Sequence, residues 1–537
     1  MSTLQGKIVV GLLAAGPPAA LLLRTYLDPQ YLASSSKTLI LLSVIICAVI
    51  LRNVTVPYFT SPLRHLPQPP GERLLTGHLL EEFAKPIGST LRRWVDNVDN
   101  AGLIFYRGIL HCFPRLLLTT PEALHEVLIT HAYDYQKPSP GRILLSRTTG
   151  QGLVVVEGHE HKLQRKSVAP AFTGKQIKDL VPLFWSKSKE FVDVIANQLD
   201  VPSGLNQAGG RTGVVDLTKW TSRATLDIIG QACVGRDFAS LYNQDDEFVQ
   251  QYDKILGKVP GNILVYGALS VLIPIHIGRW VPFFTRFRQA SDGRYHLRPL
   301  CRNLIEIKRR DMESESAKHV DILSVLIRSG QFTDDGLVDQ LLTFLAAGHE
   351  TTSGALSFTA WLLSINPSVQ NKLRAELREY FAVNTDITAA SLDQLPYLNA
   401  VTNEQLRLVP SVPTTARVAI RDTQILGQHV AAGTHIVISP WAINRSQKIW
   451  GPDAEEFRPE RWLEQETSKS PLNLMTFLHG PRSCIGQAFS RAELKCLVAA
   501  LVHKFELKMA DPGEVIEPVG LATVKPKNGL RLLLREL

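Results

Sequence analysis

The sequence predicts a mainly α-helical fold in one large domain that follows an N-terminal membrane anchor. Helical spacing of apolar residues dominates from about residue 76 onward, and there is no repeat of fixed period that would indicate a solenoid or propeller. Two nearly uncharged apolar runs precede this region, at residues 8–23 and 38–51. With 537 residues, 45% of them hydrophobic and 20% charged, the chain as a whole is not disordered, collagen-like or a coiled coil.

Charge and cysteine content limit the partners and the compartment. The chain has 58 basic and 50 acidic residues, a formal charge of +8. So small a surplus argues against nucleic acid as a partner and favours a membrane surface or an acidic protein. The cysteines lack the short paired spacings of a disulfide framework or zinc site, which indicates a reducing, cytosol-facing compartment. They are Cys47, Cys112, Cys233, Cys301, Cys484 and Cys496.

Residues 1–52 are interpreted as the anchor, with one or two transmembrane segments at about 8–23 and 31–51. The first segment has 16 residues and contains Gly16, Pro17 and Pro18, whereas a perpendicular span needs about 20. The second has 21 residues with only Lys37 charged. A cleaved signal peptide is the alternative for the first segment, but a second apolar run directly behind it argues against secretion. Basic residues after the anchor predict a cytoplasmic position for the domain. These are Arg52, Arg64 and Arg73.

Residues 53–75 form a proline-rich connector in front of a domain that spans 76–537. Five prolines between positions 57 and 70 favour a stiff, extended segment that holds the domain close to the bilayer. Within the domain, the apolar stretch 259–281 contains too many prolines and glycines for a simple membrane span. We expect it to touch the membrane surface instead.

One loop near the C-terminus carries the strongest chemical signal. Cys484 lies in the segment FLHGPRSCIG (477–486), framed by Phe477, Arg482 and Gly486, and a helix with apolar residues at helical spacing follows at once. Amides at a helix N-terminus favour a thiolate, and a thiolate beside an arginine for an anionic group suits a ligand of haem iron. An ordinary buried cysteine is the alternative. A chance match to this framing pattern is on the order of 1 in 20,000, which argues against that alternative.

A long helix is predicted at 334–365, a run of 32 residues without proline, with Thr333 as N-cap. In its middle, Gly348 and the adjacent hydroxyl residues Thr351 and Thr352 are poor choices for helix stability alone. They suggest a local opening of the helix, in which Thr351 and Glu350 hold water and relay protons to dioxygen bound at the iron. Close packing of small residues is the alternative. His349 is left without a role.

Segment 477–486 resembles the haem-binding loop of the cytochrome P450 haem-thiolate monooxygenases, and AGHET (347–351) resembles the distal helix of that family. The resemblance covers about 66–537 and is closest to fungal members of microsomal type. It implies a mainly helical, triangular domain with small β-sheets, in which haem b lies between the long distal helix and the helix of the cysteine loop. It also implies Cys484 as the metal ligand, Phe477 and Gly486 as cofactor contacts, and Glu350 with Thr351 as the catalytic pair.

The resemblance assigns further residues to structure and to the haem carboxylates. Glu404 and Arg407, at i and i+3 of a helix, would form a structural cluster with Arg461. The same acid–base spacing occurs elsewhere, at Glu306 and Arg309 for example, so position along the chain selects Glu404. Four residues match the family's propionate contacts: His161, Arg165, Arg417 and Arg482. Relatives often have Trp at the position of His161.

The implied function is insertion of one oxygen atom of dioxygen into a lipophilic substrate at the endoplasmic reticulum membrane, with the catalytic domain in the cytosol. The chain has no nucleotide-binding motif or fused flavin domain, so electrons from NADPH would arrive through a separate NADPH–cytochrome P450 reductase, with cytochrome b5 as a further candidate partner. A basic face would bind the reductase, although a merely solvated surface explains it as well. The basic face consists of Lys162, Lys166, Lys175 and Lys178.

We expect the substrate to be a secondary metabolite, such as a terpenoid, polyketide or alkaloid, ahead of a fatty acid or xenobiotic. Segments 135–156, 259–281, 344–351, 412–415 and 520–524 would line its pocket. Two alternatives stay open: a reductase-independent haem-thiolate isomerase or dehydratase, and a non-enzymatic haem-binding membrane protein.

Overall fold

The computed structural model describes residues 43–44, 48, 61–73, 76–84, 86–108, 114–199, 210–243, 246–256, 285–313, 321–464, 471–520 and 522–537. The predicted membrane segments, apart from three positions, and the stretch 259–281 lie outside these ranges, so the predictions made for them are untested. In the part that is described, none of the helices combines the length and the apolar character that crossing a membrane requires.

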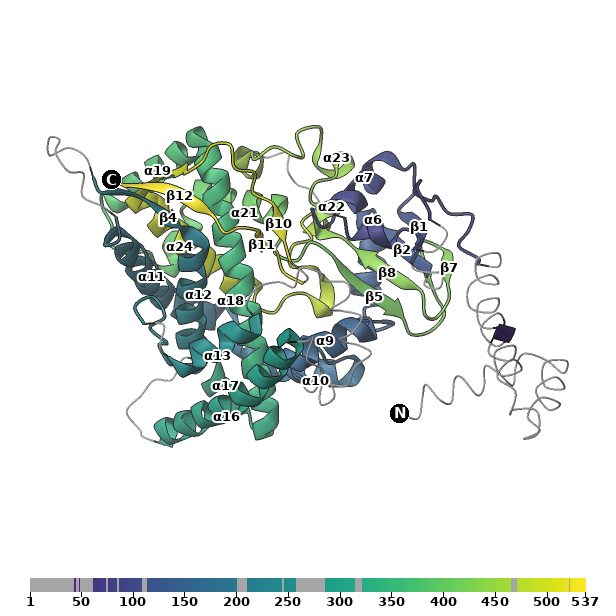
Figure 1. The fold of residues 1–537 in the computed structure, drawn as a ribbon, viewed down its shortest axis with the longest axis horizontal. Helices are drawn as coiled ribbons and strands as arrows, with labels where there is room; N and C mark the ends of the chain where they lie inside the picture. Colours follow the sequence, from purple (N-terminus) through teal and green to yellow (C-terminus); the bar gives the residue numbers. More distant parts are fainter. Residues whose placement is uncertain are drawn as a thin grey trace.

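Helices make up most of the described chain, as predicted (Figure 1). They are α6 (Leu79–Glu82), α7 (Ser89–Asn97), α8 (Pro121–His125), α9 (Ser139–Thr149), α10 (Gly158–Val168), α11 (Gly174–Ala196), α12 (Leu217–Val234), α13 (Glu247–Leu256), α16 (Thr285–Glu313), α17 (Ile322–Ser329), α18 (Asp334–Ile365), α19 (Pro367–Phe381), α20 (Ala389–Asp393), α21 (Pro396–Leu408), α22 (Pro440–Ile443), α23 (Gln447–Trp450) and α24 (Gln487–Lys504). Short helical turns are η3 (Glu126–Thr130), η4 (Ala169–Phe172), η5 (Pro459–Trp462), η7 (Pro471–Asn473) and η8 (Gly480–Arg482).

Small β-sheets accompany the helices. The largest has five strands in the order β1-β2-β8-β5-β3, and the others have three strands (β4-β12-β9) or two (β6-β7 and β10-β11). The strands are β1 (Leu103–Arg107), β2 (Pro114–Leu118), β3 (Tyr135–Gln136), β4 (Thr212–Asp216), β5 (Thr415–Ala419), β6 (Thr423–Ile425), β7 (Gln428–Val430), β8 (His435–Ile438), β9 (Phe505–Met509), β10 (Pro518–Val519), β11 (Lys525–Pro526) and β12 (Arg531–Glu536). In Figure 1 the five-stranded sheet, with α6, α7 and α22, stands apart from the helical mass around α11, α12, α18 and α24.

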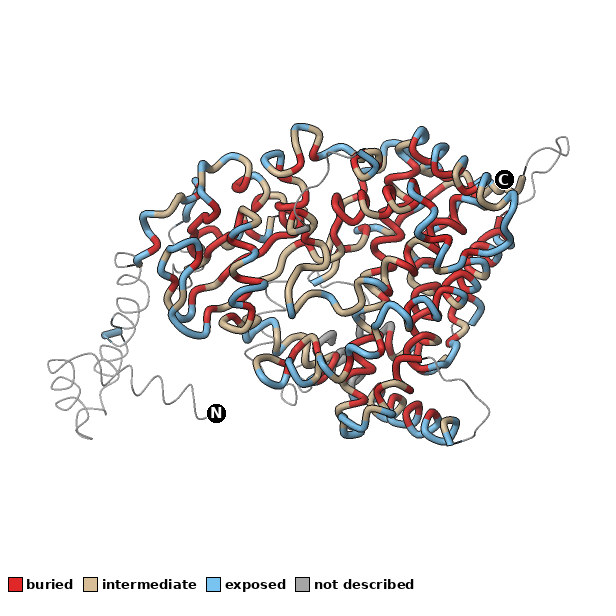
Figure 2. The backbone as a smooth tube through the Cα atoms, turned by 180° about the vertical axis from the view of Figure 1, so that it is seen from behind, coloured by how far each residue is buried: buried red, intermediate tan, exposed pale blue. Residues whose placement is uncertain are grey.

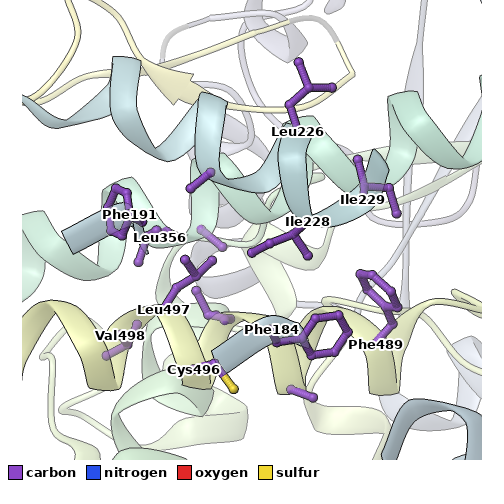
Figure 3. Packing of buried hydrophobic residues seen from close by; sticks show 14 of the residues in the cluster. Phe184, Phe191, Leu226, Ile228, Ile229, Leu356, Phe489, Cys496, Leu497 and Val498 are labelled. Atoms are coloured by element: carbon purple, nitrogen blue, oxygen red, sulfur yellow. The ribbon is translucent and has the colours of Figure 1, made fainter. Parts of the chain in front are cut away.

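The helical mass is held by a large apolar core. Phe184 and Phe191 of α11, Ile228 of α12, Leu356 of α18 and Leu497 of α24 are all at most 2% exposed and belong to one cluster (Figure 3). Figure 2 shows buried segments in the helical region and in the region of the five-stranded sheet. Burying such side chains stabilises the fold by about 1.5–3 kcal/mol each, so α18 and α24 are rigid supports for the residues that they carry.

The five-stranded sheet buries both of its faces. Alternate residues of β2 belong to different apolar clusters, because Leu116 and Leu118 pack on one side while Leu117 packs on the other. Side chains of successive strand residues point to opposite faces, so this run of leucines is explained by helices and loops that cover both.

Helix α18 begins and ends where the sequence predicted. The Thr333 hydroxyl accepts a hydrogen bond from the Gly336 amide at 3.1 Å, and the helix stops at Ile365, two residues before Pro367. A helix of 32 residues is about 48 Å long and crosses the helical part of the molecule.

Candidate active site

The cysteine loop is a tight structure closed by its own backbone. The Cys484 amide donates to the Phe477 carbonyl at 2.9 Å, and the Ser483 amide donates to the Gly480 carbonyl at 3.0 Å. Gly480 has φ +78°, and a Cβ there would collide with the Leu128 carbonyl oxygen of η3. Glycine is therefore required at this position by both conformation and space.

The residue Cys484 has solvent-exposed surface, although many protein atoms surround its thiol. Burial raises the pKa of the thiol above its ordinary value, while the Gly486 amide and the Arg165 guanidinium oppose the rise. The sequence suggested that a helix N-terminus would favour the thiolate. In the structure α24 begins at Gln487, and the amide of its N-cap, Gly486, acts on the thiol in that direction.

Gly486 is the N-cap of α24 and has an ordinary φ of −86°. A Cβ at this position would meet nothing closer than the Cys484 Sγ and the Phe172 ring, both at 4.0 Å. Neither backbone conformation nor packing within the chain requires glycine here. Its small size leaves room beside the sulfur, which is consistent with the predicted role as a cofactor contact.

Helix α10 presents His161 and Arg165 one turn apart. His161 is 3% exposed and its Nδ1 lies 3.2 Å from the Tyr133 hydroxyl, whereas Arg165 donates to the Ser483 carbonyl at 2.6 Å. Arg165 thereby ties α10 to the residue next to Cys484. The spacing of four residues puts both side chains on one face of the helix.

Arg417 and Arg482 meet the α10 residues from two other directions. Arg417 is 3% exposed and lies in the middle of β5. Arg482 donates to the Tyr135 carbonyl at 2.5 Å and forms an ion pair with Glu157. All four predicted propionate contacts therefore converge on one region.

Two residues of this region were not predicted. Glu157 accepts from the Lys137 backbone amide at 3.0 Å and from its Nζ at 3.4 Å, in addition to its pair with Arg482. Gln136 pairs with Val418 in the antiparallel β3–β5 ladder, so Lys137 continues toward Arg417. Strand pairing cannot be read from one sequence, and this explains why Lys137 was assigned only to a pocket segment. We call Lys137, His161, Arg165, Arg417 and Arg482 the basic cluster.

The basic cluster has more positive charge than its one carboxylate balances. Burial, with Arg417 and Arg482 nearby, lowers the pKa of Lys137 to about 7. Burial and Arg482 lower the pKa of Arg417 to about 10, and burial with Lys137 and Arg482 lowers that of His161 to about 4. Crowded cations with a single acid form a ready site for an anionic group.

The predicted structural cluster is present and buried. Glu404 forms two hydrogen bonds of 2.8 Å with Arg407 and one of 2.8 Å with Arg461, and none of the three is more than 2% exposed. Trp462 donates its indole N–H to the same carboxylate at 2.9 Å. Arg407 also donates to three backbone carbonyls, of Asn444, Ala454 and Glu456. The cluster thus ties α21 to the long connection that leads to the cysteine loop.

Helix α18 carries Glu350 and Thr351 in its middle. The helix is continuous there, so the predicted local opening is not present as an interruption. The Thr351 hydroxyl instead donates to the Ala347 carbonyl one turn back, at 2.7 Å. Burial raises the pKa of Glu350, while Lys525 and the hydrogen bond from Thr523 oppose the rise.

His349 turns to the other side of α18. Its Nε2 lies 2.8 Å from the Ser222 hydroxyl of α12, and its ring packs edge-on against Tyr252 of α13. Burial lowers its pKa to about 4, so the ring is neutral near pH 7. His349 therefore joins helices and does not belong to the site, in agreement with its having been left without a role.

Comparison with known proteins identifies the family. The sequence model described as Cytochrome P450 matches residues 104–533. The chain belongs to the cytochrome P450 family. It is 39% identical to the cytochrome P450 monooxygenase sphH of Aspergillus fumigatus, over 88% of each chain. It is 37% identical to the cytochrome P450 monooxygenase FUM15 of Gibberella moniliformis, over 85% of this chain and 84% of that one. With the cytochrome P450 monooxygenase ptmK of Penicillium ochrochloron it shares 35% identity, over 90% of this chain and 96% of the other.

The predicted family and class of enzyme are thus confirmed: this cytochrome P450 is an oxidoreductase with monooxygenase function. The family uses haem, and the residues present fit one. A haem carries two carboxylates, which match the surplus of cations in the basic cluster. The described part of the chain contains no group of three or more His, Cys, Asp or Glu side chains suited to a metal ion. A single thiol in an otherwise ligand-poor site suits iron that a porphyrin already holds.

Proposed function

We propose that this cytochrome P450 oxidises a lipophilic substrate, with Cys484 as the residue that would ligate haem iron and the basic cluster as the residues that would hold the haem carboxylates. The observation that carries the proposal is the convergence of three elements around the cysteine loop. The cysteine loop presents Cys484, α10 reaches it through Arg165, and β5 brings Arg417 beside Arg482. These residues lie up to 323 positions apart in the chain, between His161 and Cys484, and their meeting gathers more positive charge than Glu157 balances, which supports a site for the haem carboxylates.

The residues of α18 would manage protons. Haem, once bound, would supply the activation of dioxygen, with the Cys484 thiolate as its ligand. Burial raises the pKa of Glu350, which favours its protonated form and suits a group that holds a proton for transfer. Thr351 would pass on a proton through its hydroxyl, which now donates to the Ala347 carbonyl and must rotate to serve another acceptor.

Electrons would come from NADPH through a separate reductase, with cytochrome b5 as a further candidate. The four lysines of the basic face, Lys162, Lys166, Lys175 and Lys178, are exposed on α10 and α11. Arg165 runs from this same helix to the Ser483 carbonyl, so the face lies on the side of the cysteine loop. An acidic partner would be complementary in charge to this face, and the complementarity would mainly raise the rate at which the two proteins associate.

We further propose an N-terminal anchor in residues 1–52, in the endoplasmic reticulum membrane, and a secondary metabolite as substrate. The relatives named above are fungal monooxygenases of similar length, which supports a fungal biosynthetic setting. Apart from His349 and Glu350, the substrate segments 344–351 and 412–415 contain only apolar or weakly polar residues, consistent with a lipophilic molecule that arrives from the bilayer.

The carbon monoxide difference spectrum of the purified, dithionite-reduced protein tests the cofactor part. We expect the red-shifted Soret band that thiolate-ligated haem gives, and its loss in Cys484→Ala. A band at the shorter wavelength of haem with a neutral ligand would contradict thiolate ligation. Absence of any band would contradict haem binding itself. Cys496→Ala is the matched control, because Cys496 lies on α24 but is buried in the apolar core.

Turnover with purified reductase tests the activity against its two alternatives. A monooxygenase consumes NADPH and dioxygen in a reductase-dependent way, whereas an isomerase or dehydratase needs neither. A non-enzymatic haem protein would retain haem and show no NADPH consumption under any substrate screened. The presence of both Glu350 and Thr351 on α18 favours the first of the three.

A further inference from the structure

The C-terminal turn, residues 522–525, contacts the part of α18 that carries Glu350 and Thr351. Strand β11, which begins at Lys525, packs against α18. In Figure 1 the β10–β11 hairpin lies alongside the helix. The turn belongs to a segment, 520–524, that we expect to line the substrate pocket. The helix carries the acid that we expect to supply protons.

The first contact between the turn and α18 is made by the acid Glu350 itself. The Thr523 hydroxyl donates to the Glu350 carboxylate at 3.0 Å. Glu350 is half-buried, and Thr523 is the only hydrogen-bond donor to it that the described chain provides. A hydrogen bond donated to a carboxylate stabilises its charged form, and it also fixes the direction in which the carboxylate points.

The backbone of α18 that follows Glu350 is held as well. The Val524 amide donates to the Ser411 carbonyl at 3.0 Å, and the Ser411 hydroxyl donates to the Thr351 carbonyl at 2.9 Å. The Val524 carbonyl oxygen lies so near Gly354 that a Cβ there would be 2.7 Å away. The turn, the segment around Ser411 and α18 therefore form one packed unit around the acid and alcohol pair.

Charged groups near Glu350 are few. Lys525, on the turn, lowers the pKa of both Glu350 and His349. His349 itself is neutral near pH 7 and faces Ser222 on the other side of the helix. Within the described structure, the turn supplies both the hydrogen bond and the cation that act on the acid.

We propose that Thr523 is a positioning residue that holds the Glu350 carboxylate toward the C-terminal turn, so that contact between substrate and this turn sets the orientation of the acid beside Thr351. The proposal rests on the proposed function, because it takes Glu350 as the proton-handling group. It adds a residue outside the helix, from the segment that meets substrate, to the machinery that delivers protons. A substrate that shifts the turn would move Thr523 and thereby change the orientation of the Glu350 carboxylate.

Infrared spectroscopy of the full-length, haem-loaded protein tests the contact without a known substrate. The C=O stretch of protonated Glu350 is assigned as the band that Glu350→Gln removes, and its intensity is followed against pH. In Thr523→Val, which keeps the shape and loses the donor, we expect the titration of this band to move upward by about one pH unit. Thr523→Ser should restore the position of wild type. Lys525→Met should also move it upward, because a nearby cation is lost.

Hydrogen peroxide release per NADPH consumed, with purified reductase and no substrate, is the functional readout. We expect the ratio to change in Thr523→Val and to return in Thr523→Ser, with normal carbon monoxide spectra showing that both variants fold. An unchanged band titration in Thr523→Val with an intact fold would overturn the proposal. If Glu350→Gln alters neither the peroxide ratio nor its solvent isotope effect, the proton role of Glu350 fails, and the infrared titration still reports separately on the Thr523 contact.

Discussion

Glu493 of α24 is an acid without a counter-charge in the interior. It is 0% exposed, and neither carboxyl oxygen has a hydrogen-bond partner in the described structure. Burial raises the pKa of Glu493 well above its ordinary value, and the nearby Thr352 hydroxyl opposes the rise only in part. The group is therefore carried in its neutral form, because an unpaired buried carboxylate would cost far more.

This acid makes stability depend on pH in a known direction. The unfolded chain ionises Glu493 above about pH 4.3, whereas burial makes the folded chain hold this proton to higher pH, so the folded state loses stability as the pH rises. Relative to Glu493→Gln, we expect the free energy of unfolding of wild type to fall by up to about 1.4 kcal/mol for each pH unit above about 4.3. Urea unfolding between pH 4 and 8 measures the difference. Glu379→Gln, at an exposed position of α19, is the control and should show no such slope.

Arg407 is the opposite case, a buried cation with every donor used. Replacement by alanine leaves Glu404 buried with one cation fewer, at a cost of about 3–5 kcal/mol. We expect Arg407→Ala to lose haem, because the cluster holds the connection that leads to the cysteine loop. Haem content per mole of protein is the measurement. Arg309→Ala, which breaks an exposed pair with Asp334, should cost about 0–1 kcal/mol and keep its haem.

At the scale of elements, the ends of α18 were predictable and its middle was not. A threonine that caps the first turn and an Asn-Pro pair at the end are local signals, and local signals can be read from one sequence. The absence of an opening at Gly348 depends on what surrounds the helix. Ile229 of α12 lies so near Gly348 that a Cβ there would be 2.8 Å from it, so the glycine serves close packing of two helices in the continuous α18.

The N-cap of α18 can be tested alone. Thr333→Ala removes the acceptor for the Gly336 amide and should destabilise the protein by about 1 kcal/mol, with no change in the haem spectrum. Thr333→Ser should recover most of the loss, because it keeps the hydroxyl. Equilibrium unfolding in urea measures both variants. A loss in Thr333→Ala that also shifts the carbon monoxide spectrum would mean that the cap supports the site and not only the helix.

At the scale of the whole molecule, the site is made by topology. Cys484 and Arg482 were recognised from one short motif, whereas Glu404 was selected by a common acid–base spacing together with its position along the chain. Lys137, Glu157 and Thr523 were missed, because their roles depend on β3 pairing with β5, on α10 meeting the cysteine loop and on a C-terminal turn packing against α18. Pairings between distant segments leave no local trace in a single sequence.

The same topology makes haem retention depend on pH. Lys137 has a pKa of about 7 because burial, Arg417 and Arg482 act together on its ammonium group. A dianionic group placed among these residues would raise that pKa, so binding takes up a proton at pH values above about 7, and affinity must then fall as pH rises. Below pH 7 the lysine is charged in both states, so this group gives the affinity for haem no dependence on pH there.

Transfer of haem to an excess of apomyoglobin should therefore become faster from pH 7 to 9 in wild type. In Lys137→Met the overall rate should be higher and its pH dependence much weaker, whereas Lys175→Met, on the exposed basic face, should behave as wild type. Equal pH dependence in Lys137→Met and wild type would show that the excess charge of the basic cluster is balanced elsewhere.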